Sequence, residues 1–156
     1  MGSYVNLNEI HLPDDAGDNA EDLKKIMERI PDGWGRWLTL SKGWYKLIIE
    51  TDRKLAYICP DYEIHQVKEK FGTLRYYWGI PYDTTCFNGK SEEEKELIMS
   101  IMRDVVAQAE HRSGRICEQC GEFGRIREGG YFLTLCAACA KEKNYTISEF
   151  EEKNLS

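Results

Sequence analysis

Four cysteines near the C-terminus form the clearest chemical pattern in this sequence. Two residues separate Cys117 from Cys120 and Cys136 from Cys139, and fifteen residues lie between the two pairs. Zinc prefers four soft or borderline ligands in a tetrahedron, and thiolates at about 2.3 Å satisfy that preference. Two residues between cysteines allow a tight turn to direct both sulfurs at one ion. The spacing therefore predicts one structural zinc ion held by all four thiolates.

The ligand set also indicates what this metal would not do. Four cysteines leave no open coordination position for a water molecule, so a catalytic zinc is disfavoured. A redox dithiol is the alternative, although a single pair with two intervening residues would suffice for that chemistry.

The residues around the cysteine pairs favour a finger of the treble-clef type. Residues 123–127 and 131–135 can pair as a hairpin across two glycines, and residues 137–143 are helix formers. Gly121 suits a tight knuckle after Cys120, where a positive φ is often needed. We predict a zinc finger over residues 113–145, followed by a tail over residues 146–156.

A second candidate site lies upstream, in residues 62–80. Two runs rich in strand formers flank Phe71-Gly72, which predicts a β-hairpin. Cations alternate there with aromatic residues, as on surfaces that stack bases and neutralise phosphates. The alternative is that one face packs on helices while the cations merely solubilise the other. The candidate ligand-binding residues are Lys68, Lys70, Arg75, Tyr77 and Trp78.

Helical periodicity predicts the elements that must position these sites. Apolar residues recur at helical spacing over 20–30 and 43–58. The clearest helix covers 91–112, because Ser91 and Glu94 form a capping-box pattern before an apolar stripe. We expect an irregular acidic arm over 1–18 and an α+β core over 19–112. The predicted fold class is α+β: helices packed on a small antiparallel hairpin or sheet, with a C-terminal treble-clef-like zinc finger.

Other arrangements that could do chemistry receive less support from the sequence. Cys59 is expected to be a buried thiol and Cys86 to lie in a loop, so pairing of either with His65 or His111 for catalysis is disfavoured. A histidine–asparagine nuclease site is also disfavoured, because no histidine lies on the finger hairpin. A partly open aromatic pocket for a small ligand stays open as an alternative; its residues would be Trp34, Trp37 and Trp44.

Composition and charge narrow the class of protein. The 156 residues are 42% hydrophobic and 31% charged, which is typical of a globular chain. The net charge of −6 argues against a general DNA-coating role, but residues 33–90 carry +3. No signal peptide or run of 18 apolar residues is evident, so we expect a cytoplasmic protein in a bacterial host cell, with no membrane contact.

The hairpin and cysteine segments together carry a family resemblance. Residues 66–77 read QVKEKFGTLRYY, residues 117–121 read CEQCG and residues 134–139 read TLCAAC. This combination resembles a family of small uncharacterised bacterial and phage proteins, with the match covering roughly residues 60–140. The resemblance implies that hairpin and finger form one unit, and a phage or prophage source. It transfers no activity.

These observations favour a non-enzymatic, zinc-stabilised cytosolic binding protein. Its partner would be a protein or an anionic ligand, either nucleic acid or a nucleotide, and the resemblance fits a phage-encoded inhibitor of a host system. The competing hypothesis is a nuclease-like enzyme acting on nucleic acid or nucleotides through the basic aromatic hairpin.

Overall fold

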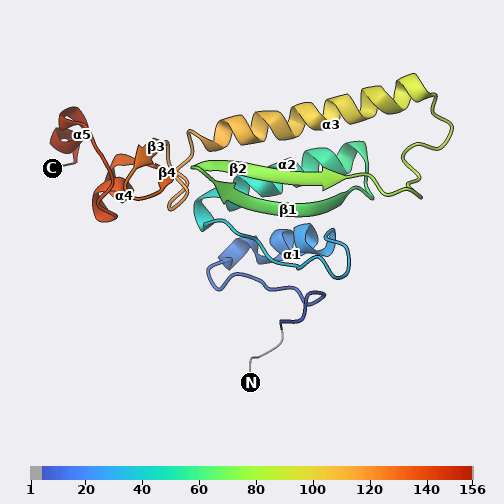
Figure 1. Cartoon of the computed structure of the whole chain (residues 1–156), viewed down its shortest axis with the longest axis horizontal. Coiled ribbons are helices and arrows are strands. Elements are labelled where there is room, and N and C mark those ends of the chain that lie inside the picture. Colours follow the sequence, from blue (N-terminus) through green and yellow to red (C-terminus); the bar gives the residue numbers. More distant parts are fainter. Residues whose placement is uncertain (1–4, 156) are drawn as a thin grey trace.

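The computed structural model describes residues 5–155, and its α+β architecture confirms the predicted fold class. Figure 1 shows a helical and hairpin body with a smaller cysteine-bearing module at one end. In chain order, the elements are η1 (Gly17–Asn19), α1 (Ala20–Glu28), η2 (Lys42–Trp44), α2 (Tyr45–Ile58), β1 (Glu63–Lys70), β2 (Thr73–Gly79), α3 (Glu92–Ser113), β3 (Arg125–Glu128), β4 (Phe132–Leu135), α4 (Ala137–Glu142) and α5 (Glu149–Asn154).

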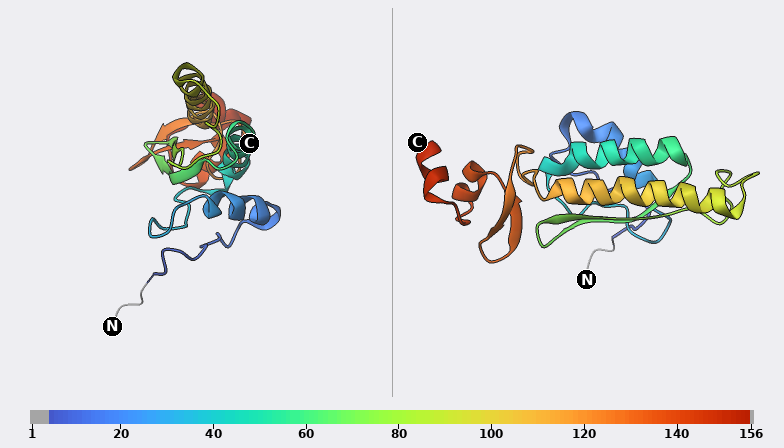
Figure 2. Two further views of the ribbon diagram at one scale, coloured as in Figure 1. Left: turned by 90° about the vertical axis from the view of Figure 1, so that its right-hand side faces the viewer. Right: turned by 90° about the horizontal axis from the view of Figure 1, so that it is seen from above.

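The hairpin of β1 and β2 is the centre of the larger body. Its turn has two residues, Phe71 and Gly72, with φ values of 55° and 82°. Positive φ at both positions is the geometry of a type I′ turn, which matches the natural twist of the strands. Val67, Leu74 and Tyr76 are buried on the inner face. Figures 1 and 2 show α2 and α3 lying to one side of this hairpin, so its outer face is left open.

Both edges of the hairpin are covered by other parts of the chain. Along β1, the amide of Thr39 donates to Val67, and the amide of Glu69 donates back to Thr39. Along β2, the amide of Leu74 donates to Ser113 Oγ at 2.8 Å and that of Tyr76 to Glu110 Oε2 at 3.0 Å. The second edge is therefore completed by side chains of α3.

The main core lies between the inner hairpin face and the helices. Residues from α1, α2, α3 and both strands form one buried cluster, which includes Leu23, Ile48 and Met102. The long helix α3 begins at a capping box in which Ser91 Oγ accepts from the amide of Glu94 and the Glu94 carboxylate accepts from the amide of Ser91. The predicted capping residues are thus confirmed.

A polar network is enclosed in this core. Tyr62 donates to Asp52 at 2.5 Å, and its hydroxyl lies 2.7 Å from that of Tyr76. Arg29 Nε lies 2.7 Å from Asp52 Oδ1, a charge contact without the alignment of a hydrogen bond, and Arg29 Nη1 donates to two backbone carbonyls. Burial is the main cause that raises the pKa of Tyr62 and Tyr76 far above the usual range of tyrosine. Both hydroxyls therefore stay protonated in the folded state.

The element boundaries depart from the sequence prediction at the two ends. The expected irregular arm over 1–18 already enters η1 at Gly17, and its first four residues lie outside the described part. The expected tail over 146–156 contains helix α5, which begins at a second capping box formed by Ser148 and Glu151; residue 156 is not described. Within residues 5–155, none of the helices combines the length and apolar character needed to cross a membrane.

Candidate metal centre and the neighbouring hairpin face

The thiols of Cys117, Cys120, Cys136 and Cys139 converge on one point. All four Sγ atoms lie within 4.8 Å of one another, and Cys120 Sγ is 3.7 Å from Cys136 Sγ. A tetrahedron with metal–sulfur distances of about 2.3 Å has sulfur–sulfur edges of about 3.8 Å. The observed separation matches that edge and is far longer than a disulfide bond of about 2.05 Å. The cluster therefore has the geometry to hold one metal ion.

Local backbone structure places each pair of thiols. Gly121 adopts a φ of 82°, and its amide donates to the carbonyl of Cys117, which closes the first knuckle. The antiparallel strands β3 and β4 then return the chain to this knuckle. Cys136 is the N-cap of α4, where its Sγ accepts from the amide of Cys139 at 3.4 Å. The second pair thus sits at a helix start, as the sequence indicated.

The electrostatic environment of the thiols is that of a crowded anion site. Burial raises the pKa of Cys117, but the backbone amides of Cys136, Cys120 and Gln119 outweigh it and bring this pKa down to about 7. Burial and the neighbouring thiols raise the pKa of Cys139 well above its ordinary value. A central cation would offset this mutual repulsion and favour the thiolate form of every cysteine.

The cysteine module is docked to the hairpin and to η2 by a small set of hydrogen bonds. The indole of Trp44 donates to the carbonyl of Ile116 at 2.7 Å. Thr134 Oγ1 donates to the carbonyl of Gly72, in the hairpin turn, at 2.6 Å. These bonds join positions 72 and 62 residues apart in the chain. The metal centre and the hairpin turn are therefore held in a fixed relation.

Glu118 is buried beside the metal ligands and takes part in the same interface. Its Oε2 accepts from the amide of Thr134 at 2.6 Å, and its backbone pairs with the Thr134 carbonyl. Burial is the first cause that raises the pKa of Glu118 to about 7, while the Thr134 amide opposes the shift. This carboxyl links the first knuckle to β4.

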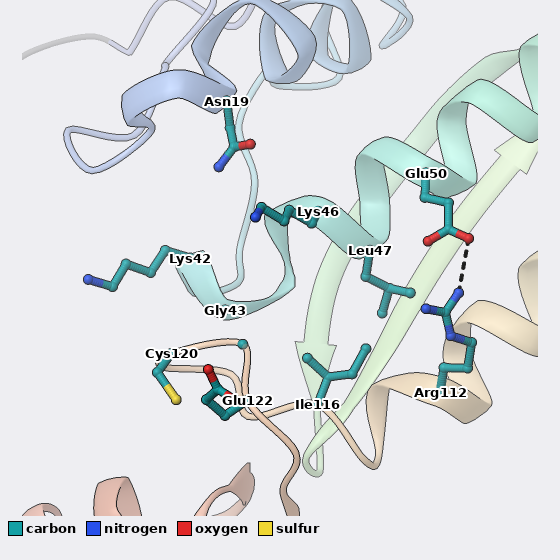
Figure 3. A pocket seen from close by; sticks show the side chains of 11 residues that line it. Asn19, Lys42, Gly43, Lys46, Leu47, Glu50, Arg112, Ile116, Cys120 and Glu122 are labelled. Atoms are coloured by element: carbon teal, nitrogen blue, oxygen red, sulfur yellow. Dashed lines mark hydrogen bonds and ion pairs between the residues drawn. The ribbon is translucent and has the colours of Figure 1, made fainter.

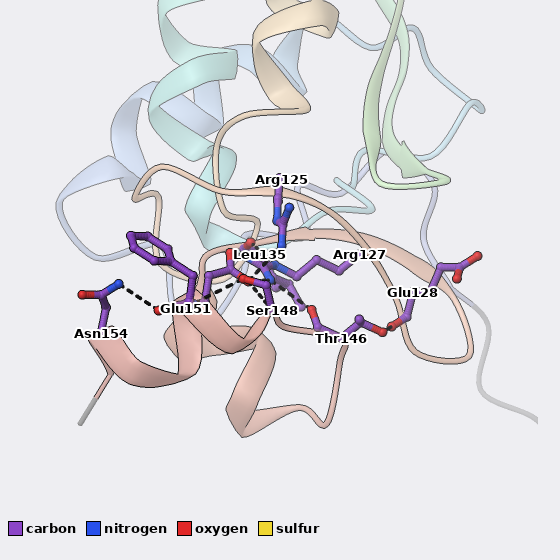
Figure 4. A network of polar contacts seen from close by, with 9 residues as sticks. Arg125, Arg127, Glu128, Leu135, Thr146, Ser148, Glu151 and Asn154 are labelled. Atoms are coloured by element: carbon purple, nitrogen blue, oxygen red, sulfur yellow. Dashed lines mark hydrogen bonds and ion pairs between the residues drawn. The ribbon is translucent and has the colours of Figure 1, made fainter.

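Helix α5 is attached to the module by an arginine fork, shown in Figure 4. The Arg127 side chain is only 4% exposed and donates through both Nη atoms to the Glu151 carboxylate, at 2.9 and 2.7 Å. Arg127 Nε also donates to the carbonyl of Leu135 at 2.8 Å. Hydrogen bonding to Arg127 is the main cause that holds the pKa of Glu151 far below its ordinary value.

A cavity of about 300 Å³ opens where the cysteine module meets η2 and α2. Figure 3 shows Lys42 and Lys46 extending from this wall and Arg112 reaching Glu50, at 3.2 Å. The lining also includes Glu122 and the Cys120 thiol. Because cations, carboxylates and a cysteine meet here, the lining has no clear excess of positive or negative charge.

Four of the five candidate residues of the hairpin lie in or beside its open face. Lys68 and Arg75 are directly opposite each other in the strand register, and Lys68 Nζ lies 6.0 Å from the centre of the Tyr77 ring. Lys70 and Phe71 continue this arrangement at the turn. We call Lys68, Lys70, Phe71, Arg75 and Tyr77 the open face. Trp78 instead belongs to the inner face, where it packs partly buried against the core.

Sequence reasoning missed further groups at the end of the open face. Trp34 is 55% exposed and its ring centroid lies 4.7 Å from that of His65. The His65 ring in turn lies over Gly79, where an added Cβ would be 2.7 Å from its Cε1 atom. Only the aromatic character of residues 33–38 hinted at this contact. The proposed pocket of three tryptophans is not supported, because Trp44 is fully buried and bonded to Ile116.

Within residues 5–155, neither of the two remaining cysteines is hydrogen-bonded to a histidine. Cys59 is buried and donates to Asp61 Oδ1 at 3.2 Å, as expected for an inert thiol. Burial is the first cause that raises its pKa to about 12. Cys86 donates to the carbonyl of Ile58 at 3.4 Å.

Comparisons with protein-family models, with curated proteins and with solved structures return no match for this chain. The resemblance to bacterial and phage proteins therefore stays a prediction from the sequence.

Proposed function

We propose that this chain is a non-enzymatic binding protein that is stabilised by one structural zinc ion and binds an anionic ligand on the open face of its hairpin. The cysteine module supports the first part. Its order of knuckle, hairpin and helix start resembles that of a treble clef, and four clustered cysteine side chains suit the closed tetrahedral ligand set that zinc prefers.

Neither the zinc ion nor Cys59 is suited to catalysis. A zinc ion with four thiolate ligands has no position for an activated water. Cys59, with its pKa of about 12, is a thiol and not a nucleophilic thiolate at neutral pH.

The pairing of Lys68 with Arg75 carries the proposal for the anionic ligand. Like charges directly opposite each other on one sheet face are destabilising. In residues 5–155, no carboxylate lies within ion-pair distance of either cation or of Lys70. Glu69 lies on the same strand, but its carboxylate accepts from the amide of Gly72 at the turn. A bound anion would relieve the repulsion.

The binding of heparin, a flexible polyanion, tests this proposal at low and moderate salt. Lys68→Glu/Arg75→Glu should lose most of the affinity, and the wild-type affinity should fall steeply with added salt. Lys24→Glu/Lys90→Glu is the matched control, because it changes the net charge equally at two exposed lysines elsewhere. Equal loss in both double variants, or no wild-type binding at low salt, would contradict the proposal.

A further inference from the structure

A groove lies beyond the hairpin turn, between the C-terminal end of α3 and the cysteine module. The groove has a volume of about 440 Å³, and its lining includes the apolar residues Phe123 and Ile126 as well as the charged residues Arg115, Arg125 and Glu110. Phe123 is 77% exposed and Ile126 is 46% exposed. The groove thus presents apolar surface next to a guanidinium group.

The groove continues the open face. Thr73 lines it and also begins β2, where it is paired with Lys70 and lies two residues before Arg75. A Cβ built on Gly114 would be 4.0 Å from Thr73 Cγ2 and 4.0 Å from Ile126 Cδ1. One extended ligand could therefore pass from the open face across Thr73 into the groove.

Phe123 and Arg115 both line the groove, and backbone contacts join the two segments that carry them. Ile116 and Phe123 form an antiparallel bridge, and the amide of Gly124 donates to the carbonyl of Arg115 at 2.8 Å. Within the described chain, Arg115 has no carboxylate within ion-pair distance, and Nη1 of Arg115 lies 2.8 Å from His111 Nε2. The groove's Glu110 accepts from the amide of Tyr76. The lining of the groove therefore includes both a flat apolar ring and a planar cation.

These features favour one class of ligand. Bases of single-stranded nucleic acid stack on exposed aromatic rings while cations follow the backbone phosphates. In a duplex, the base faces are stacked on one another and cannot reach such rings. Aromatic residues lie at both ends of the path, at Tyr77 and at Phe123, with Lys68, Arg75, Lys70 and Arg115 between or beside them.

We propose that a single-stranded nucleic acid lies along the open face and enters this groove, where a base stacks on Phe123 and Arg115 contacts a phosphate. This inference rests on the proposed function of the open face and names its ligand. It also gives the cysteine module a direct role, because residues between its two cysteine pairs form one wall of the site.

Fluorescence anisotropy with a labelled 20-nucleotide mixed-sequence single strand, as RNA and as DNA, tests the inference on the full-length protein. Phe123→Ala should weaken binding of the single strand about tenfold and leave heparin binding nearly unchanged. Arg115→Glu should weaken both. Tyr131→Ala is the matched control, since Tyr131 is an 81% exposed aromatic residue of the same module, at the opposite turn. The metal content and circular dichroism of each variant establish that it is folded.

The outcomes separate this inference from the proposed function. Equal binding of duplex and single strand, or no effect of Phe123→Ala, overturns the single-strand inference even if Lys68→Glu/Arg75→Glu abolishes heparin binding. Loss of single-strand binding in Phe123→Ala but not in Lys68→Glu/Arg75→Glu supports the groove and overturns the role of the open face. If the protein prefers the single strand, and if Phe123→Ala and Lys68→Glu/Arg75→Glu both bind it weakly, the result supports the groove and the open face alike.

Discussion

The amide of Gly43 donates to the carbonyl of Glu118 at 2.7 Å, which joins the start of η2 directly to the first cysteine knuckle. No side chain fits at this contact. A Cβ on Gly43 would collide with the carbonyl oxygen of Cys117 and come within 2.5 Å of the carbonyl carbon of Glu118. The backbone of the larger body is therefore in direct contact with the backbone of the first cysteine knuckle.

Gly43→Ala should therefore destabilise the docking of the cysteine module. Both colliding atoms belong to the backbone, so the module must shift, at a cost of about 1–3 kcal/mol. Urea unfolding monitored by tryptophan fluorescence measures the change. Gly114→Ala is the control, because its Cβ would meet only ordinary contacts at 3.6 Å or more. A Gly43→Ala protein as stable as the control would contradict this packing.

Removal of the metal should unfold the cysteine module and release its contacts with the hairpin. Structural zinc in small fingers supplies local folding free energy of order 10 kcal/mol. Elemental analysis should find one zinc per chain, and Cys120→Ser should lower zinc affinity. Tryptophan fluorescence should change on chelation, because the Trp44 indole is bonded to Ile116, next to the first ligand. Protein purified without chelator that contains no zinc would overturn the metal assignment.

Glu151→Gln should detach α5 from the cysteine module. It should also change how the free energy of unfolding depends on pH in acid. The folded-state pKa of Glu151 is lowered, chiefly by Arg127, so its contribution is present above about pH 4.3 and is lost as pH falls. We expect the free energy of unfolding to fall by about 1–3 kcal/mol at pH 7. Below pH 4, the free energy of unfolding of the variant should depend less on pH than that of the wild type. Amide hydrogen exchange in residues 137–155 reports the local effect. Glu149→Gln, in the same helix, should leave exchange unchanged.

Asp52→Ala should be among the most damaging substitutions in the larger body. It leaves Arg29 without its carboxylate and Tyr62 without its acceptor in a buried setting. Breaking a buried ion pair costs about 3–5 kcal/mol, whereas an exposed pair is worth at most about 1 kcal/mol. Asp22→Ala, which removes the exposed partner of Arg53, is therefore the control in thermal or urea unfolding. Similar losses in both variants would disprove the importance of the network.

The sequence was most informative where local chemistry determines the result. The spacing of four cysteines, the glycine of the knuckle and the capping pattern at Ser91 depend on neighbouring residues only, and all have the expected geometry. The turn at Phe71-Gly72 belongs to the same group. Helix α5 was missed although Ser148 and Glu151 carry the same signature as Ser91 and Glu94.

The remaining features depend on contacts between distant segments. Nothing local in the sequence pairs Trp44 with Ile116 or Thr134 with Gly72. Alternation separated the inner from the outer side of the hairpin but did not decide which side the helices would cover. Trp78 is a candidate only through the mixture of aromatic residues and cations in this segment, and the structure places it on the face opposite to Tyr77. The groove beside Phe123 is formed by three segments: the start of β2, the end of α3 and the cysteine module that follows α3.

The closed edges of the hairpin limit how this molecule can meet other proteins. An uncovered strand edge invites another chain to add a strand, which is a common route to aggregation. Here Thr39 occupies one edge, while Ser113 and Glu110 occupy the other. The β1–β2 hairpin therefore offers a partner its exposed side chains and little free backbone, and it is a poor template for fibril growth.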